Sequence, residues 1–108
     1  MYNGFSILIP TWNNLDYLKL CVCSIRQHSA YNHQIIIHVN DGSDGTLEWV
    51  KAEGLEYTHS DKNIGVCLAM NSMRRHVKTD YIYFINDDMY VLPNWDVVLM
   101  NEIKSLHS

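Results

Sequence analysis

Two neighbouring carboxylates near the end of the sequence could bind a divalent cation. Asp87 and Asp88 follow the apolar run 82–85, and adjacent carboxylates repel each other unless a cation lies between them and a ligand. Oxygen ligands suit Mg²⁺ or Mn²⁺ rather than Zn²⁺, and diphosphate oxygens or water would complete the octahedron. The pair therefore predicts a Mg²⁺ or Mn²⁺ site. The alternative is that either residue caps the turn before Pro93.

A third carboxylate could recognise a nucleotide base. Asp41 comes directly after the predicted strand 34–40, which contains the β-branched residues, and a carboxylate there can accept a hydrogen bond from N3–H of uracil or thymine. Adenine has no such ring N–H, so a uridine or thymidine nucleotide fits better, and the sequence leaves UDP and dTDP open. Asp44 is expected instead at the exposed start of the following helix, where its charge favours the helix N-terminus.

These side chains need strands and helices to position them. Apolar and β-branched runs predict strands at 5–10, 34–40, 55–59 and 80–85. Apolar residues spaced three and four apart, with turn formers at the ends, predict helices at 15–29, 46–53, 63–77 and 95–106. Asn13 or Asn14 is expected to cap the first helix, and Pro10 is expected to end the first strand.

The alternation of strands and helices predicts an α/β fold. Short right-handed connections would give a Rossmann-like three-layer α/β/α domain with a mainly parallel sheet. Each strand is followed by a polar cluster, and in such a sheet all four clusters lie along one edge, where ligands bind. The alternative is that they are ordinary turns, since Asn, Asp, Gly and Ser favour turns whatever the function.

Length and composition exclude several classes of protein. A chain of 108 residues that is 47% hydrophobic predicts one folded domain. The net charge of −4 argues against a nucleic-acid-binding protein. Three cysteines and no apolar N-terminal leader favour a cytoplasmic protein, with membrane association in a full-length context left open. An unprotected sheet or helix surface would favour a homo-oligomer.

Four strings of residues carry a family resemblance. PTWNN follows the first predicted strand, NDGSDGT the second, NIGVCLAMN comes after the third, and INDDM ends the fourth. In order and spacing they resemble the N-terminal, nucleotide-sugar-binding half of family 2 glycosyltransferases with the GT-A fold. The resemblance covers essentially the whole chain. It implies a single nucleotide-sugar-binding domain over residues 1–108 that is truncated at its C-terminus.

The resemblance also implies the roles of individual residues. Asp88 matches the final Asp of the metal-binding D-x-D motif and is the expected metal ligand. Asn86 and Asn40 replace the first Asp of two common motifs, and Met70 stands where many members carry a basic residue. The residues expected to bind the nucleotide sugar are Pro10, Thr11, Trp12, Asn13, Asp41, Ser43, Asn63, Gly65, Asn71, Asn86 and Asp87.

The implied reaction transfers a sugar, with inversion, from a UDP- or dTDP-linked donor to a hydroxyl of an acceptor glycan or lipid-linked glycan. Inversion needs a carboxylate base, which in this family lies in the second half of the domain, so no catalytic residue is assigned here. One alternative is a catalytically silent nucleotide-binding or assembly module of the same fold. Another is a receiver or flavodoxin-like domain, but 11–13 lacks the acidic residues that a receiver needs after its first strand.

Overall fold

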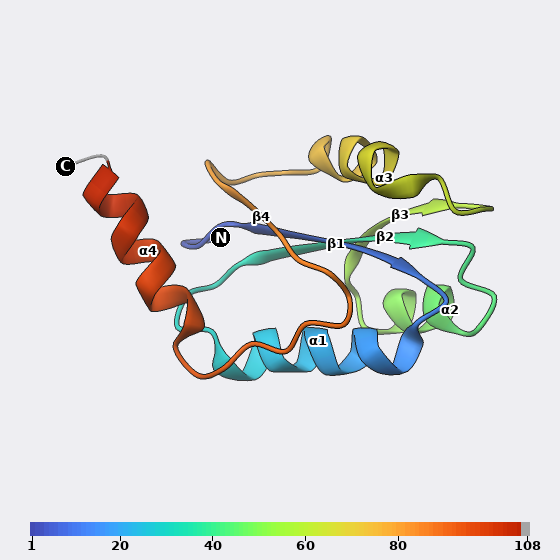
Figure 1. The fold of residues 1–108 in the computed structure, drawn as a ribbon, viewed down its shortest axis with the longest axis horizontal. Coiled ribbons are helices and arrows are strands. Elements are labelled where there is room, and N and C mark those ends of the chain that lie inside the picture. The colour runs from blue at the N-terminus through green and yellow to red at the C-terminus, as the bar shows by residue number, and fades with distance from the viewer. Residues whose placement is uncertain (107–108) are drawn as a thin grey trace.

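The computed structural model describes residues 1–106 and contains a four-stranded parallel sheet with strand order β3-β2-β1-β4. Figure 1 shows the arrangement. The strands are β1 (Ser6–Trp12), β2 (Gln34–Asn40), β3 (Glu56–Ser60) and β4 (Ile82–Phe84). The helices are α1 (Leu15–His28), α2 (Thr46–Ala52), α3 (Gly65–Arg74) and α4 (Trp95–Leu106). The predicted α/β class and the alternating order of elements are confirmed.

Helices cover both faces of the sheet. In Figure 1, α1 and α2 lie on one face and α3 lies on the other, while α4 projects beyond the end of the sheet. Alternate residues of β1 divide between the two layers, because side chains of a strand point to opposite faces. Ile7 and Ile9 pack with α1 residues such as Leu18, whereas Leu8 packs with Met73 of α3. Burial on both faces explains why the strand is continuously apolar.

The prediction that Pro10 ends the first strand is wrong. β1 continues to Trp12, and Pro10, Thr11 and Trp12 all pair with β2. The main-chain N of Ser6 donates to Tyr81 O (2.9 Å) and Leu8 O accepts from Ile85 N (3.1 Å). The main-chain N–H and C=O groups of Ser6, Leu8 and every second residue of β1 therefore point toward β4. Pro10 belongs to this set, but pairing with β4 ends at Leu8. The N–H that proline lacks is therefore not needed by the ladder with β2.

The start of α1 also differs from expectation. Asn14 stands at the N-cap position but makes no capping hydrogen bond through its side chain. Asp44 accepts from the first amide of α1, Leu15 N (3.3 Å), and from Thr46 N of α2 (3.1 Å). One carboxylate thus binds amides at the N-termini of two helices. The hydrogen bonds from Thr46 and Leu15 outweigh burial and hold the pKa of Asp44 below its ordinary value.

A buried carboxylate joins α4 to the sheet. Asp96 is fully buried and accepts hydrogen bonds from Ala30 N (3.0 Å), Tyr31 N (2.9 Å) and His33 Nε2 (2.7 Å). His33 Nδ1 accepts from Phe5 N (3.0 Å), so the ring is the neutral tautomer with its proton on Nε2. Burial lowers the pKa of His33 despite the hydrogen bond and charge of Asp96.

Two further observations concern the buried His38 and the lengths of the helices. His38 is buried, and its ring nitrogens lie 2.6 Å from Thr58 Oγ1 and 3.0 Å from Ser60 Oγ, which makes it a satisfied core residue. Within residues 1–106, no helix has the length and apolar character needed to cross a bilayer.

Candidate functional site

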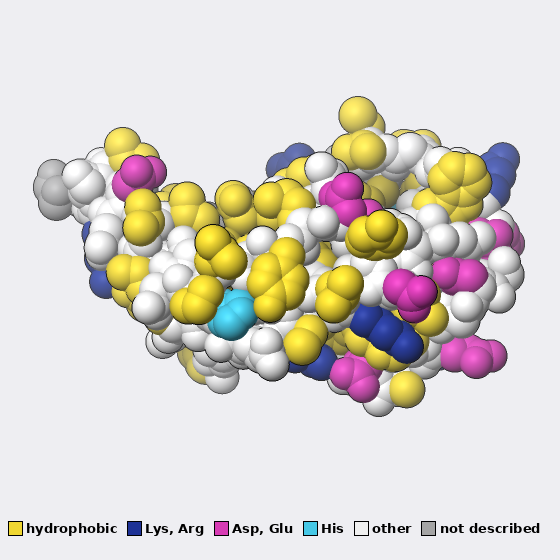
Figure 2. Space-filling view, turned by 60° about the horizontal axis from the view of Figure 1, so that its bottom comes forward, with side chains coloured by type: hydrophobic (Ala, Val, Ile, Leu, Met, Phe, Trp, Pro, Cys, Tyr) yellow, Lys and Arg dark blue, Asp and Glu magenta, His cyan; other side chains and the backbone are white. Residues whose placement is uncertain are grey.

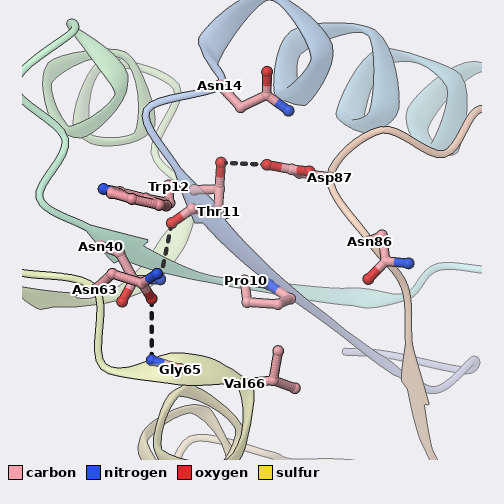
Figure 3. Close-up of a pocket in the computed structure, with 10 residues that line it drawn as sticks. All are labelled: Pro10, Thr11, Trp12, Asn14, Asn40, Asn63, Gly65, Val66, Asn86 and Asp87. Atoms are coloured by element: carbon pink, nitrogen blue, oxygen red, sulfur yellow. Dashed lines mark hydrogen bonds between the residues drawn. The ribbon is translucent and has the colours of Figure 1, made fainter.

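The largest collection of predicted residues surrounds a cavity at the carboxyl ends of the strands. Its volume is about 360 Å³, and Figure 3 shows its lining. Three segments supply the predicted residues: the end of β1, the start of α3 and the loop after β4. The predicted residues that line the cavity are Pro10, Thr11, Trp12, Asn63, Gly65, Asn86 and Asp87. The strand ends therefore meet at one edge of the sheet, as expected for ligand sites in this class of fold.

A hydrogen bond joins two sides of this cavity. Thr11 Oγ1 donates to Asp87 Oδ2 at 2.8 Å, and Figure 3 shows the two side chains directed toward each other. Thr11 is 2% exposed and Asp87 is half-buried. One carboxylate oxygen of Asp87 is thus held by the end of β1. The other oxygen keeps its capacity to accept from or bind a ligand.

The expected metal ligand, Asp88, is exposed and is not part of the cavity lining. The charges of Asp87 and Asp88 nevertheless both affect the nearby thiol of Cys21. Burial, followed by the charges of Asp87 and Asp88, raises the pKa of the Cys21 thiol to about 12. No three His, Cys, Asp or Glu side chains within residues 1–106 form a metal-binding group. The donor set fits a Mg²⁺ or Mn²⁺ ion that takes one or two carboxylates and completes its shell from phosphate and water.

Asn13, Asp41 and Ser43 form a separate group between the β1–α1 and β2–α2 loops and are not among the cavity residues. Asn13 Nδ2 donates to Asp41 Oδ2 (3.0 Å), and Asn13 Oδ1 accepts from Gly42 N (3.0 Å). The other Asp41 oxygen accepts from Ser43 N (3.3 Å). Asn13 and Asp41 have φ values of 46° and 62°, in the left-handed region that Asn and Asp tolerate better than most residues. The hydrogen bond from Asn13 therefore holds the Asp41 carboxylate against the β1–α1 loop.

The start of α3 contributes a polar turn. Asn63 Oδ1 accepts from Gly65 N at 3.0 Å, and Gly65 has a φ of 82°, a conformation that glycine adopts without strain. Val66, the next residue, also lines the cavity. Asn71 lies further along α3, where it is exposed and does not line the cavity.

Three lining residues were not predicted as site residues: Asn14, Asn40 and Val66. Asn40 is 4% exposed and donates from Nδ2 to Thr11 O (3.0 Å), while its Oδ1 accepts from Ile64 N (3.0 Å). A polar residue at the end of an apolar strand was a usable signal, since buried amides are normally hydrogen-bonded. For Val66 the sequence offers no comparable signal.

Charge in this region is predominantly negative. Asp41, Asp87 and Asp88 lie in the loops after β2 and β4. Figure 2 shows that most of the acidic side chains visible on the α1 side lie toward the end of the molecule at which the strands end. Such a distribution favours a cation beside an anionic ligand.

Comparison with known proteins decides the family. The model of the family described as "Glycosyl transferase family 2" matches residues 6–107. The chain belongs to glycosyltransferase family 2. Curated relatives include chondroitin synthase from Escherichia coli, 28% identical over 100 residues, and glycosyltransferase GlyA from Streptococcus pneumoniae serotype 4, 25% identical over 103 residues. These matches take in 86% and 91% of this chain but only 14% and 15% of the relatives.

Solved structures confirm the GT-A fold of this family 2 chain. S. aureus TarS 1-349 in complex with UDP-GlcNAc is 19% identical with a TM-score of 0.80, and the match covers 97% of this chain and 32% of that one. The mannosyltransferase PcManGT from Pyrobaculum calidifontis, in complex with GDP-Man and Mn²⁺, is 21% identical with a TM-score of 0.78. That match covers 95% of this chain and 32% of the mannosyltransferase.

Proposed function

We propose that this chain binds a nucleoside diphosphate sugar and forms the donor-binding part of an inverting, metal-dependent glycosyltransferase. The observation that carries the proposal is the cavity at the strand ends, in which the end of β1, the start of α3 and the loop after β4 meet. The ligands named for the two structural neighbours, UDP-GlcNAc and GDP-Man with Mn²⁺, support the same class of donor. The acceptor in this proposal is a hydroxyl of a glycan or lipid-linked glycan.

The base of the nucleotide would lie between Trp12 and Asp41. The Trp12 side chain is 58% exposed and lines the cavity, so its ring is available to stack on a base. A carboxylate has about four acceptor positions, and Asp41 uses three of them for Asn13 Nδ2, Ser43 N and Ser43 Oγ. The remaining position suits a single donor such as N3–H of uracil or thymine.

The diphosphate would lie toward the loop after β4. Asp88 would hold the Mg²⁺ or Mn²⁺ ion, with Asp87 kept in place by Thr11. When bound, this ion would neutralise charge on the leaving diphosphate. Asn86 lines the cavity and offers an amide that can hydrogen-bond a ribose hydroxyl. Glu102 is exposed on α4, where it borders a different cavity with Phe5 and Ile103, so we give it no part in the reaction.

Calorimetric titration with UDP tests this proposal. We expect weak binding that strengthens with Mn²⁺, and we expect Asp88→Ala to remove the metal dependence while UDP still binds. Asp80→Ala is the matched control, because Asp80 is an exposed carboxylate before β4, at the opposite end of that strand. UDP that fails to bind the unaltered chain, or Mn²⁺ dependence that survives in Asp88→Ala, would contradict the proposal.

A further inference from the structure

Asn40 lies at the point where three segments around the cavity meet. It is the last residue of β2, and its side chain contacts the neighbouring strand and the start of α3 at once. Nδ2 donates to the main-chain carbonyl of Thr11 at 3.0 Å, and Figure 3 shows this bond. Oδ1 accepts from the main-chain N–H of Ile64, also at 3.0 Å. One buried amide thus spans the gap between β1 and the residue before α3.

The chemistry of these partners fixes the direction of the amide. A main-chain carbonyl can only accept and a main-chain N–H can only donate. The Asn40 side chain must therefore present its nitrogen to Thr11 and its oxygen to Ile64. An ionised aspartate could serve Ile64 but not Thr11, because it has no proton to donate. In this chain the amide therefore serves both main-chain partners at once, which an ionised carboxylate in the same place could not do.

A third polar group lies beside Asn40 on the β3 side. Ser60 Oγ lies 3.2 Å from Asn40 Oδ1, 3.0 Å from His38 Nε2 and 2.7 Å from Lys62 O, and its single proton is shared among these neighbours. Since His38 and Asn40 are both buried, solvent cannot readily replace these bonds. The buried bond from Asn40 Nδ2 to Thr11 O of β1 therefore ties the amide to the sheet.

We propose that Asn40 is a positioning residue of the nucleotide pocket. By fixing Thr11 O and Ile64 N relative to each other, it sets the spacing between the Trp12 and Val66 sides of the cavity. That spacing determines the affinity for the nucleoside diphosphate. This inference rests on the proposed function, in which the same cavity holds the donor.

The experiment compares Asn40→Ala with Gln34→Ala in UDP titrations with Mg²⁺. Gln34 is the matched control, because it is a buried amide at the other end of β2 and bonds to Ser6 Oγ (2.8 Å) and His76 O (2.7 Å). Asn40→Ala should weaken UDP binding about tenfold. Gln34→Ala should lower the melting temperature but leave the Kd within about twofold. Hydrogen exchange at the Ile64 amide should accelerate only in Asn40→Ala.

Asn40→Asp supplies a readout that general destabilisation would not give. Its ionised carboxylate cannot donate to Thr11 O, but the protonated acid can. Relative to the unaltered chain, UDP affinity of Asn40→Asp should recover as the pH falls from about 8 to about 5, whereas Asn40→Ala should show no recovery. This variant also serves if Asn40→Ala does not fold.

Two results separate the inference from the function on which it rests. An unaltered chain that binds no UDP overturns the proposed function, and the role of Asn40 with it. An unaltered chain that binds UDP, with equal loss of affinity in Asn40→Ala and Gln34→Ala or no loss in either, overturns the role of Asn40 alone. If the UDP affinity of Asn40→Asp does not recover at low pH, the proposed role of Asn40 is contradicted as well.

Discussion

Replacing Asp96 with alanine should destabilise the protein more than any exposed acidic substitution. Its carboxylate accepts from Ala30 N, Tyr31 N and His33 Nε2 at 2.7–3.0 Å, and these bonds hold the start of α4 against the loop between α1 and β2. The two main-chain bonds and the His33 bond outweigh the effect of burial and keep the pKa of Asp96 below its ordinary value. The side chain is therefore ionised at neutral pH, and its partners depend on that charge.

The size of the effect follows from which donors lose their partner. Ala30 is exposed, so water can replace the carboxylate at its amide. Tyr31 is half-buried and His33 is 8% exposed, so their N–H groups would remain unpaired. At about 1.5 kcal/mol for each unpaired donor, Asp96→Ala should lower the free energy of unfolding by about 3 kcal/mol. Domains of this size are stable by about 5–15 kcal/mol, so the variant should still fold.

Urea denaturation followed by circular dichroism measures this loss. With a slope of about 1.5 kcal/mol per molar, the midpoint should fall by about 2 M. Asp80→Ala, which changes an exposed carboxylate, should stay within about 0.5 kcal/mol of the unaltered chain. A change of less than about 0.5 kcal/mol in Asp96→Ala would refute the reasoning, because it would mean that the three hydrogen bonds do not anchor α4.

Two further predictions concern thiols and pH. Cys23 and Cys67 are exposed, whereas Cys21 is buried and its pKa is raised to about 12. A thiol reagent should therefore label Cys23 and Cys67 rapidly and Cys21 only on unfolding. Rapid labelling of all three would contradict the packing of α1. The pKa values of His33 and Asp96 are both lowered on folding, so the unfolded state binds more protons. Burial lowers the pKa of His38 as well, so the free energy of unfolding should fall below about pH 6.5 as His33 and His38 titrate, and again below about pH 3.8 for Asp96. A flat profile in urea denaturation would contradict this.

The central strands of the sheet could be predicted from the sequence because each is a short apolar run that is recognisable without its neighbours. The runs that became β1 and β2 are apolar on both faces, as expected when helices cover a parallel sheet on each side. The extent of β1 could not be predicted, since Pro10 ends a strand only if its missing N–H faces a partner. That depends on where pairing with β4 stops, which the local sequence does not encode.

Contacts between distant residues were also beyond prediction. His33 and Asp96 are 63 residues apart in sequence, and neither lies in a motif that would pair them. Asp44 replaces Asn14 as the partner of the first α1 amide for the same reason, because only the folded chain brings the second loop beside the first. A cap was expected from local preference, and a tertiary contact supplied it.

The candidate site was predicted best where motif residues lie at or just after the carboxyl end of a strand. Thr11, Trp12 and Asp87 line the cavity as expected, since the ends of parallel strands meet at one edge. Asp41 also follows a strand, but its side chain bonds to Asn13 and does not line the cavity. The role of Asn40 could not be predicted from the sequence, because its two main-chain partners, Thr11 O and Ile64 N, are brought together only in the folded chain.

The most direct test of the central claim is an amide resonance map of the isotope-labelled protein during titration with UDP and Mg²⁺. If the cavity at the strand ends binds the donor nucleotide, saturable shifts should concentrate at Trp12, Asn40, Gly65 and Asp87. Residues 78–81, which lead into β4 at the opposite end of that strand, should not shift. Shifts that do not saturate, or that cluster away from the cavity, would contradict the account.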